Sequence, residues 1–541
     1  MPEIKVTFQP GGETIVAAPG ELTIKDAAKL AGVFLELQCG GKGKCGKCRV
    51  TVTEGAQPPA ETELKHISKE DLSKGVRLAC QSKITQNIKV QVSRKAQVDR
   101  KKLFLSAVVP DGQETSGVST KLGLAVDIGT TTVVGVLVDL ETKRALAVTA
   151  LTNPQYIHGA DVISRINHVI NDPEGLKNVQ KEITGAINEM IDVLCSETGA
   201  KPGNIANMSV VGNTTMQHFF LGIDPRSLAV APYKPPVTGK YESVKAIKLG
   251  VKINPETPVY VVPNIAGWVG GDTVGVVLAT RQHKAEKLKL SVDIGTNGEL
   301  VLGSRKKMMA ASTAAGPCFE GARISCGMRA TTGAIESVYI AEEGIFWRVV
   351  DRIKALGICG SALIDTVAEL LKFGIIDETG RILCRGELDG KIPQVLLKSI
   401  IEHEEGNSFE ITDNVILTQR DIRELQLAKA AIFAGIQVLI KELGIELKDI
   451  DEILLAGTFG NYIDKANAQK IGLIPNIALE KVRYVGNAAC EGARIALVST
   501  EGRWEAEEIA EQVEYIELSG RPDFQDAFVD AMLFEKHWHQ N

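Results

Sequence analysis

The feature that most constrains the fold of this chain is a short turn that occurs twice. Segment 127–132 reads DIGTTT, and segment 293–298 reads DIGTNG. Each lies between two strand-like runs, in GLAVDIGTTTVVGVLVDL and in KLSVDIGTNGELVLG. A strand, turn and strand that recur in this way, among amphipathic helices, indicate two related halves of a duplicated α/β fold.

Both turns carry groups suited to the phosphates of a nucleotide. Their glycines permit a tight hairpin whose amides face phosphate oxygens, and their hydroxyls add donors. The residues expected to bind the nucleotide in this way are Gly129, Thr130, Thr131, Thr132, Gly295, Thr296 and Asn297. Asp127 and Asp293 stand where Mg²⁺ and its waters require carboxylates. The alternative, two ordinary hairpins with small polar residues, stays open. A P-loop and a strand-linked G-x-G-x-x-G are absent.

A second pattern, of cysteines and glycines, lies near the N-terminus. Cys39, Cys45 and Cys48 occur in C-G-G-K-G-K-C-G-K-C, and Cys80 occurs in R-L-A-C-Q. Four thiolates suit iron or zinc, but a zinc ribbon typically offers two C-x2-C pairs. Three cysteines around a glycine loop, with a lone fourth, favour a [2Fe-2S] cluster. A zinc site or unrelated buried cysteines remain the alternative.

Length and charge limit the other classes of function. A chain of 541 residues predicts several domains, and a formal net charge of −6 offers no basic face for nucleic acid. No apolar run is long enough to cross a membrane, and MPEIKVTFQP lacks the pattern of a signal peptide. We therefore expect a cytoplasmic protein with no nucleic-acid or membrane partner. The expected domains are an iron–sulfur domain (1–94), a linker (95–121), a middle domain (122–205) and a C-terminal domain (206–541).

The cysteine segment resembles the ferredoxin family, in a variant with five residues between the first two ligands. The resemblance implies a β-grasp fold with Cys39, Cys45, Cys48 and Cys80 as cluster ligands.

The two turns, together with A-G-T-F-G at 456–460, resemble the acetate and sugar kinase/Hsp70/actin superfamily. The resemblance implies a duplicated actin-like (RNase H-like) ATPase that holds ATP between its halves. Asp127 and Asp293 would then serve Mg²⁺ and its waters. Gly457, Phe459 and Gly460 would lie near the nucleoside, whereas Thr458 stands where a second glycine is commoner, which puts close approach there in doubt.

Several longer stretches carry a more specific resemblance. They are NPQYIHGADVISRI (153–166), VGNTTMQH (211–218), STAAGPCFEGA (312–322), LTQRDIRELQLAKA (417–430) and GNYID (460–464). With the ferredoxin segment they resemble the reductive activators of corrinoid proteins. The resemblance implies ATP-dependent reduction of Co(II) to Co(I), a corrinoid partner from a methyltransferase or acetyl-CoA system, and an upstream low-potential electron donor. A homodimer is one assembly compatible with the sequence.

Two questions stay open at this point. Asp272, in G-W-V-G-G-D-T-V-G, either orients the water that attacks the γ-phosphate or caps a helix. The chain could instead be an activator of the dehydratase type, or a ferredoxin that senses nucleotide without hydrolysing it. A small-molecule kinase would have no use for the four cluster cysteines.

Overall fold

The structure is a computed structural model that describes most of the chain. The described residues are 4–9, 12, 14–17, 19–20, 22–31, 33, 43, 46, 48–92, 121–159, 161–321, 323–330, 333–460 and 462–534. The expected ligands Cys39 and Cys45 lie outside these residues, as does the expected linker apart from Lys121.

The N-terminal domain is a five-stranded mixed sheet whose described residues also form three short helices, among them α2 (Glu61–His66) and α3 (Lys69–Ser73). Its strands run in the order β2 (Thr14–Ala17), β1 (Ile4–Gln9), β5 (Ile88–Gln91), β3 (Arg49–Glu54) and β4 (Val76–Leu78). Along β1 the side chains of Ile4, Val6 and Phe8 are buried, as the period of a strand requires. They pack in one core with Ile24 and Ala27 of helix α1 (Ile24–Leu30). This arrangement is the predicted β-grasp.

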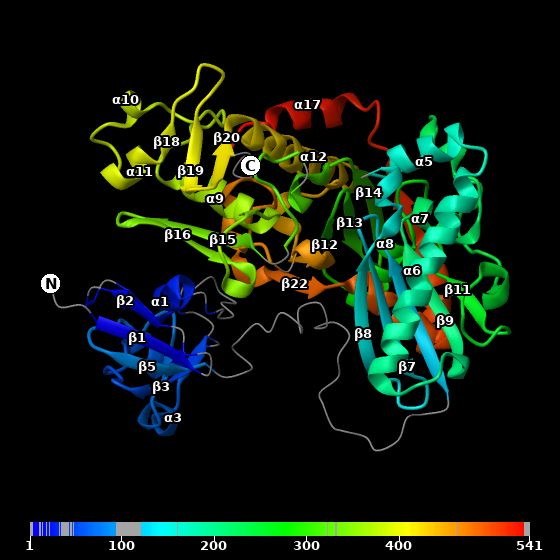
Figure 1. The fold of residues 1–541 in the computed structure, drawn as a ribbon, viewed down its shortest axis with the longest axis horizontal. Coiled ribbons are helices and arrows are strands. Elements are labelled where there is room, and N and C mark those ends of the chain that lie inside the picture. Colours follow the sequence, from blue (N-terminus) through cyan, green and yellow to red (C-terminus); the bar gives the residue numbers. More distant parts are fainter. Residues whose placement is uncertain are drawn as a thin grey trace.

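Two six-stranded sheets form the centre of the part of the molecule that follows (Figure 1). The first runs β10 (Val244–Lys245), β11 (Pro258–Val261), β9 (Ile205–Gly212), β6 (Leu122–Ile128), β7 (Thr132–Asp139) and β8 (Ala145–Thr152). The second runs β22 (Val482–Gly486), β21 (Glu452–Ala456), β12 (Lys289–Ile294), β13 (Gly298–Ser304), β14 (Lys307–Thr313) and β23 (Val513–Tyr515).

The two sheets share one topology. In each, the first strand begins an antiparallel meander of three strands and pairs on its other side with a parallel strand, β9 for β6 and β21 for β12. Asp127 and Asp293 are both the last residue but one of their strands. The predicted duplication is therefore confirmed. The first sheet continues through β9 and β11, across the boundary expected at 205/206, because β6 needs a parallel neighbour from later in the chain.

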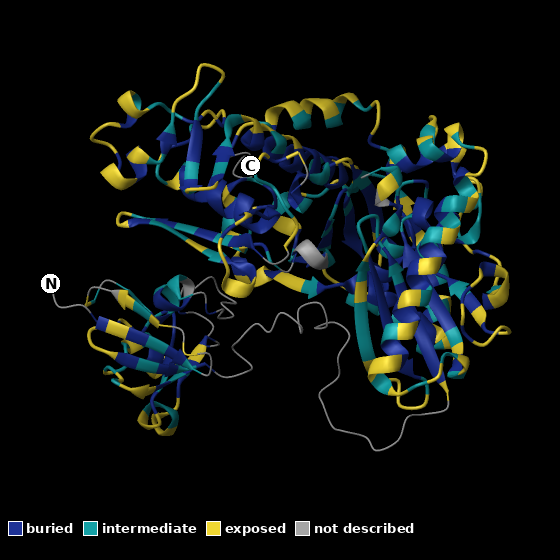
Figure 2. Cartoon of the chain, viewed as in Figure 1, coloured by how far each residue is buried: buried dark blue, intermediate teal, exposed yellow. Residues whose placement is uncertain are grey.

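Helices fill the space between the sheets and cover their outer faces. Helices α6 (Gly175–Thr198) and α7 (Thr214–Leu221) pack on the first sheet, and α12 (Gln419–Leu443) packs on the second. Helices α8 (Gly271–Thr280) and α15 (Ala488–Val498) share one core with residues of both sheets. Figure 2 shows these central elements mostly buried.

Helices α8 and α15 touch through their backbones. A Cβ atom added to Gly492 would lie 2.3 Å from the Cα of Gly275, and one added to Gly275 would lie 2.8 Å from the carbonyl oxygen of Ala489. Only glycine permits this approach. The two halves of the fold are thus connected by a helix crossing in direct main-chain contact.

The second half also carries two small sheets between β14 and β21. One contains β16 (Gly344–Val349), β15 (Ala334–Ala341) and β17 (Gly357–Ile358); the other contains β18 (Ile400–Ile401), β19 (Ser408–Thr412) and β20 (Val415–Thr418). Helix α9 (Gly360–Lys372) packs against β15. These elements form a lobe on the outer side of the second sheet (Figure 1).

Candidate functional site

Each repeated turn is closed by a main-chain hydrogen bond from its glycine, which spans three residues in the first turn and two in the second. The amide of Gly129 donates to the carbonyl of Thr132, and the amide of Gly295 donates to the carbonyl of Asn297, each at 3.0 Å. A Cβ atom at position 129 would lie 2.6 Å from the oxygen of Thr132. Glycine is therefore required in the first turn for the tight hairpin that the sequence predicts.

One carboxylate joins the two turns. The hydroxyl of Thr131 donates to Oε2 of Glu320 at 2.5 Å, and the hydroxyl of Thr296 donates to Oε1 of the same side chain at 2.6 Å. Glu320 ends the short 3-10 helix η6 (Pro317–Glu320), which follows β14. The structure thus brings two predicted phosphate-binding hydroxyls, from opposite halves of the fold, to within the span of a single carboxylate.

Four acidic side chains gather behind these turns. Burial, together with the charge of Asp272, raises the pKa of Asp127 and of Asp293 to about 7. Burial likewise raises the pKa of Asp272 to about 6. Burial raises the pKa of Glu299, which pairs with Asp293 across β12 and β13, and the charges of Asp272 and Asp293 add to this. Desolvated carboxylates that repel one another favour a cation nearby.

The carboxylates do not form a complete metal site by themselves. Among the described residues, no three His, Cys, Asp or Glu side chains converge closely enough to hold a metal ion. Such an arrangement fits a cation that keeps most of its waters and is held partly by a ligand's phosphates, as Mg²⁺ usually is.

Asp272 does not cap its helix. Helix α8 begins at Gly271 with Gly270 as its N-cap, and the Asp272 carboxylate accepts from the neighbouring amide of Thr273 at 2.8 Å. Its charge acts on both Asp293 and Glu299. The side chain therefore belongs to the acidic cluster at the helix N-terminus.

The third predicted turn lies against the second strand turn. Gly457 has φ +83°, and a Cβ atom there would lie 2.3 Å from Oδ1 of Asp293, so a side chain is excluded. Gly457–Gly460 form a single helical turn, α13, directly after β21. The side chains of Thr458 and Phe459 lie outside the described part of the chain.

A buried arginine supports the first turn from behind. Arg165 is only 1% exposed, and its guanidinium donates to the carbonyls of Thr130 at 2.7 Å and Gly159 at 3.0 Å. In the described part of the chain no carboxylate lies within ion-pair distance of it. Burial lowers its pKa to about 10, while the charges of Asp161 and Glu320 act in the opposite direction. The turn is therefore backed by a buried positive charge.

Three asparagines complete the support of the turns. Asn153 donates to the carbonyl of Gly129 at 2.9 Å, and Asn213 donates to the hydroxyl of Thr130 at 3.0 Å while its own oxygen caps α7. Asn487 donates to Asp127 at 2.8 Å and caps α15. The Asn213 side chain therefore makes a turn contact and a helix cap at the same time.

Five residues of this site were not assigned roles from the sequence, namely Asn153, Arg165, Glu299, Glu320 and Asn487. Asn153, Arg165 and Glu320 lie in the unusual stretches 153–166 and 312–322, and this position was the one sequence feature that could have pointed to them. No sequence feature pointed to Glu299 or Asn487 as site residues.

Two of the four predicted cluster ligands lie together in the N-terminal domain. The thiols of Cys48 and Cys80 are buried, and their sulfurs are 3.2 Å apart without a disulfide. The contact with Cys48 lowers the pKa of Cys80 to about 6. Gly43 and Gly46 both have positive φ, and Cβ atoms there would clash with Gln81 and His66. Two converging thiols beside two glycines of positive φ fit a shared iron–sulfur group.

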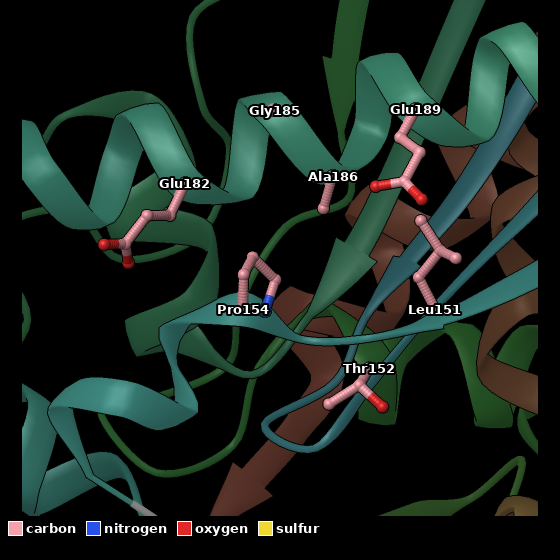
Figure 3. A pocket seen from close by; sticks show the side chains of 7 residues that line it. All are labelled: Leu151, Thr152, Pro154, Glu182, Gly185, Ala186 and Glu189. Carbon is pink, nitrogen blue, oxygen red and sulfur yellow. The ribbon is translucent and has the colours of Figure 1, made fainter.

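A pocket of about 370 Å³ lies apart from this site, between β8 and α6 (Figure 3). It is lined by Leu151, Thr152, Pro154, Glu182, Gly185, Ala186 and Glu189. None of these is a predicted site residue.

No helix in the described stretches combines the length and apolar character that a membrane crossing needs.

Three protein families match successive parts of the chain. The family described as "2Fe-2S iron-sulfur cluster binding domain" matches residues 6–85, "RACo middle region" matches 122–285, and "C-terminal domain of RACo the ASKHA domain" matches 287–541.

Individual proteins match over most of the chain. Corrinoid activation enzyme RamQ of Eubacterium limosum is 32% identical over 578 residues, which cover 95% of this chain and 96% of that protein. The Co(II) methylated amine-specific corrinoid protein reductase of Methanosarcina barkeri is 27% identical over 72% of each chain. A solved structure described as a reductive activator for corrinoid, iron-sulfur protein is 32% identical, covers 98% of both chains and superposes with a TM-score of 0.69.

Proposed function

Because the chain belongs to the family of reductive activators of corrinoid proteins, we propose that it uses ATP to reduce the Co(II) of a corrinoid protein to Co(I). The observation that carries this proposal is that the similarity covers 95% of this chain and 96% of its relative, so that the ferredoxin domain and the nucleotide clamp occur together. Either part alone would have many other uses.

The two turns hold the phosphate chain between the halves of the fold. The amides and hydroxyls of residues 129–132 and 295–297 donate to its oxygens, and the Arg165 guanidinium adds positive potential from behind the first turn. Asp127 and Asp293 would hold Mg²⁺ with its waters, and the charge of the bound ion would favour their ionised form. Asp272 orients the attacking water, and the turn at Gly457–Gly460 lies along the nucleoside.

The cysteines Cys39, Cys45, Cys48 and Cys80 hold the iron–sulfur group. When bound, a [2Fe-2S] cluster supplies single electrons at low potential. Burial of Cys48 and Cys80 would keep water away from these two ligands, and the positive φ of Gly43 and Gly46 would let the main chain pass close to the group.

The partner is a corrinoid protein, which we propose belongs to a methyltransferase or acetyl-CoA system. A low-potential donor refills the cluster, and the reaction takes place in the cytoplasm, where thiolate ligands stay reduced. A homodimer is the assembly to be tested first. The dehydratase-activator and nucleotide-sensor alternatives both predict that ATP has no effect on a Co(II) corrinoid.

Anaerobic spectroscopy of the full chain tests this function. The protein, reduced with titanium(III) citrate, is mixed with a Co(II) corrinoid protein, and the Co(I) absorption is followed with and without Mg·ATP. We expect Co(I) to accumulate with ATP and ATP hydrolysis to be stimulated by the corrinoid protein. Asp293→Ala should abolish both while the cluster spectrum stays intact, and Glu189→Ala, an exposed residue outside the site, should behave as wild type. Equal Co(I) yields with and without ATP would exclude the proposed coupling.

A further inference from the structure

The bridge formed by Glu320 uses the same atoms that a phosphate needs. A threonine hydroxyl has one proton to donate. In the bridge, the protons of Thr131 and Thr296 both point to the Glu320 carboxylate, at 2.5 and 2.6 Å. A phosphate oxygen therefore cannot accept from either hydroxyl until the carboxylate leaves.

Charge leads to the same exclusion. A carboxylate and a phosphate at hydrogen-bond distance from one hydroxyl would repel each other strongly in a site with little water. The buried guanidinium of Arg165, which feels the charge of Glu320, can balance one of these anions from behind the turn. The site is thus built to hold one anion at this place, and Glu320 meets that requirement from within the chain.

The segment that carries Glu320 is attached to both halves of the fold. Helix η6 lies between Gly316 and Gly321, which both have positive φ, and the Gly316 amide donates to the carbonyl of Thr296 at 3.0 Å. Downstream, the Ser325 amide donates to Asp421 at the start of α12. Arg329 then donates to the hydroxyl of Thr152, at the end of β8 in the other half, at 3.2 Å.

From this geometry we propose that Glu320 is a phosphate-displaced latch, a residue that sets nucleotide affinity by occupying the hydroxyls of both turns. Binding of a nucleoside triphosphate exchanges the carboxylate for phosphate and releases η6 between its two glycines. The release loosens the described residues that follow, 321 and 323–330, and the contact of Arg329 with Thr152. This inference rests on the proposed function, since it requires that the clamp bind a nucleotide.

Nucleotide affinity gives the first test. The dissociation constants of Mg·ADP and of a non-hydrolysable Mg·ATP analogue are measured by calorimetry for the full chain. Glu320→Ala should bind both at least about tenfold more tightly than wild type, because hydrogen bonds to a charged acceptor must otherwise be broken first. Glu320→Gln, which keeps the size of the side chain but not its charge, should have dissociation constants between those of Glu320→Ala and wild type. Glu189→Ala serves as the matched glutamate control.

Hydrogen exchange of the wild-type chain gives a second test that needs no variant. The analogue should slow exchange in the two turns but accelerate it in residues 316–330. Unchanged dissociation constants in both Glu320 variants, or protection of residues 316–330 by the analogue, would overturn the latch.

The other outcomes are distinguishable. A loss of turnover in Glu320→Gln with an unchanged dissociation constant would make Glu320 a catalytic carboxylate and would also overturn the latch. If neither wild type nor Glu320→Ala bound any adenine nucleotide, the proposed function itself would fail.

Discussion

The contact between helices α8 and α15 allows a stability prediction with a control inside the same chain. In Gly492→Ala the new methyl group would begin 2.3 Å from Gly275, against backbone atoms that cannot turn away. Restoring ordinary carbon contact requires the helices to separate by about 1 Å. Gly185, in the middle of α6, has nothing within 4 Å of its Cβ position, so Gly185→Ala adds a methyl group without a clash.

Two effects of the added methyl group, higher helix propensity and overpacking, oppose each other in Gly492→Ala, whereas only the first acts in Gly185→Ala. Replacing glycine by alanine inside a helix stabilises it by about 1 kcal/mol. Overpacking a tight contact costs about 1–3 kcal/mol. We therefore expect Gly185→Ala to raise the free energy of unfolding by about 1 kcal/mol and Gly492→Ala to lower it by about 1 kcal/mol.

Urea unfolding followed by circular dichroism measures this difference of about 2 kcal/mol between the two variants. Hydrogen exchange should further show that the loss in Gly492→Ala is concentrated in α8 and α15. If Gly492→Ala proved as stable as Gly185→Ala, the helices would not be in main-chain contact, and the connection between the halves would have to be described differently.

Three further predictions concern the site itself. Burial raises the pKa of Asp127 to about 7, so protons compete with Mg²⁺ at this carboxylate. The affinity for Mg·ATP, measured by calorimetry, should therefore fall from pH 8 to pH 6. Asp127→Asn should flatten this pH dependence, and an unchanged slope in the variant would contradict the prediction. Cys80→Ser should alter or remove the EPR signal of the reduced cluster, whereas Cys326→Ser should leave it unchanged; the reverse result would mean that the ligands are misassigned. Arg165→Met should lower the free energy of unfolding by about 1–3 kcal/mol, because the Thr130 carbonyl loses its buried donor. The variant should also bind ATP more weakly. If stability and ATP affinity both stayed at their wild-type values, Arg165 would not support the first turn.

The duplicated fold could be predicted because its signal is local. A strand that ends in Asp-Ile-Gly-Thr reveals its direction, its buried face and its turn within a few residues, and two copies reveal the repeat. The β-grasp domain could be predicted equally well, since its hairpin, helix and cysteine segment follow one another along the chain. The pairing of β9 with β6 was harder to predict, because two strands and two helices lie between them in the chain.

The residues that complete the site could not be predicted in this way. The hydroxyl of Thr131 meets Glu320 across 189 residues of sequence, and Asn487 meets Asp127 across 360. No local period or motif encodes such pairs, because they exist only once both sheets have formed and their turns face each other. Glu299 is a similar case, since an acidic residue early in a strand is ordinarily exposed.

The latch and the helix crossing together address the energetic problem of the proposed reaction. Co(I) is a strong reductant, and every 59 mV by which the cluster falls short costs about a factor of ten in the one-electron equilibrium. Nucleotide can change that equilibrium only if its bound states favour the two cobalt states unequally. Such a difference requires an element with two arrangements that feels the phosphates. Glu320 contacts the hydroxyls of both halves, and Gly275 and Gly492 let helices α8 and α15 cross in main-chain contact between those halves. Exchange of carboxylate for phosphate is therefore a local event that a rigid-body movement can carry to the partner.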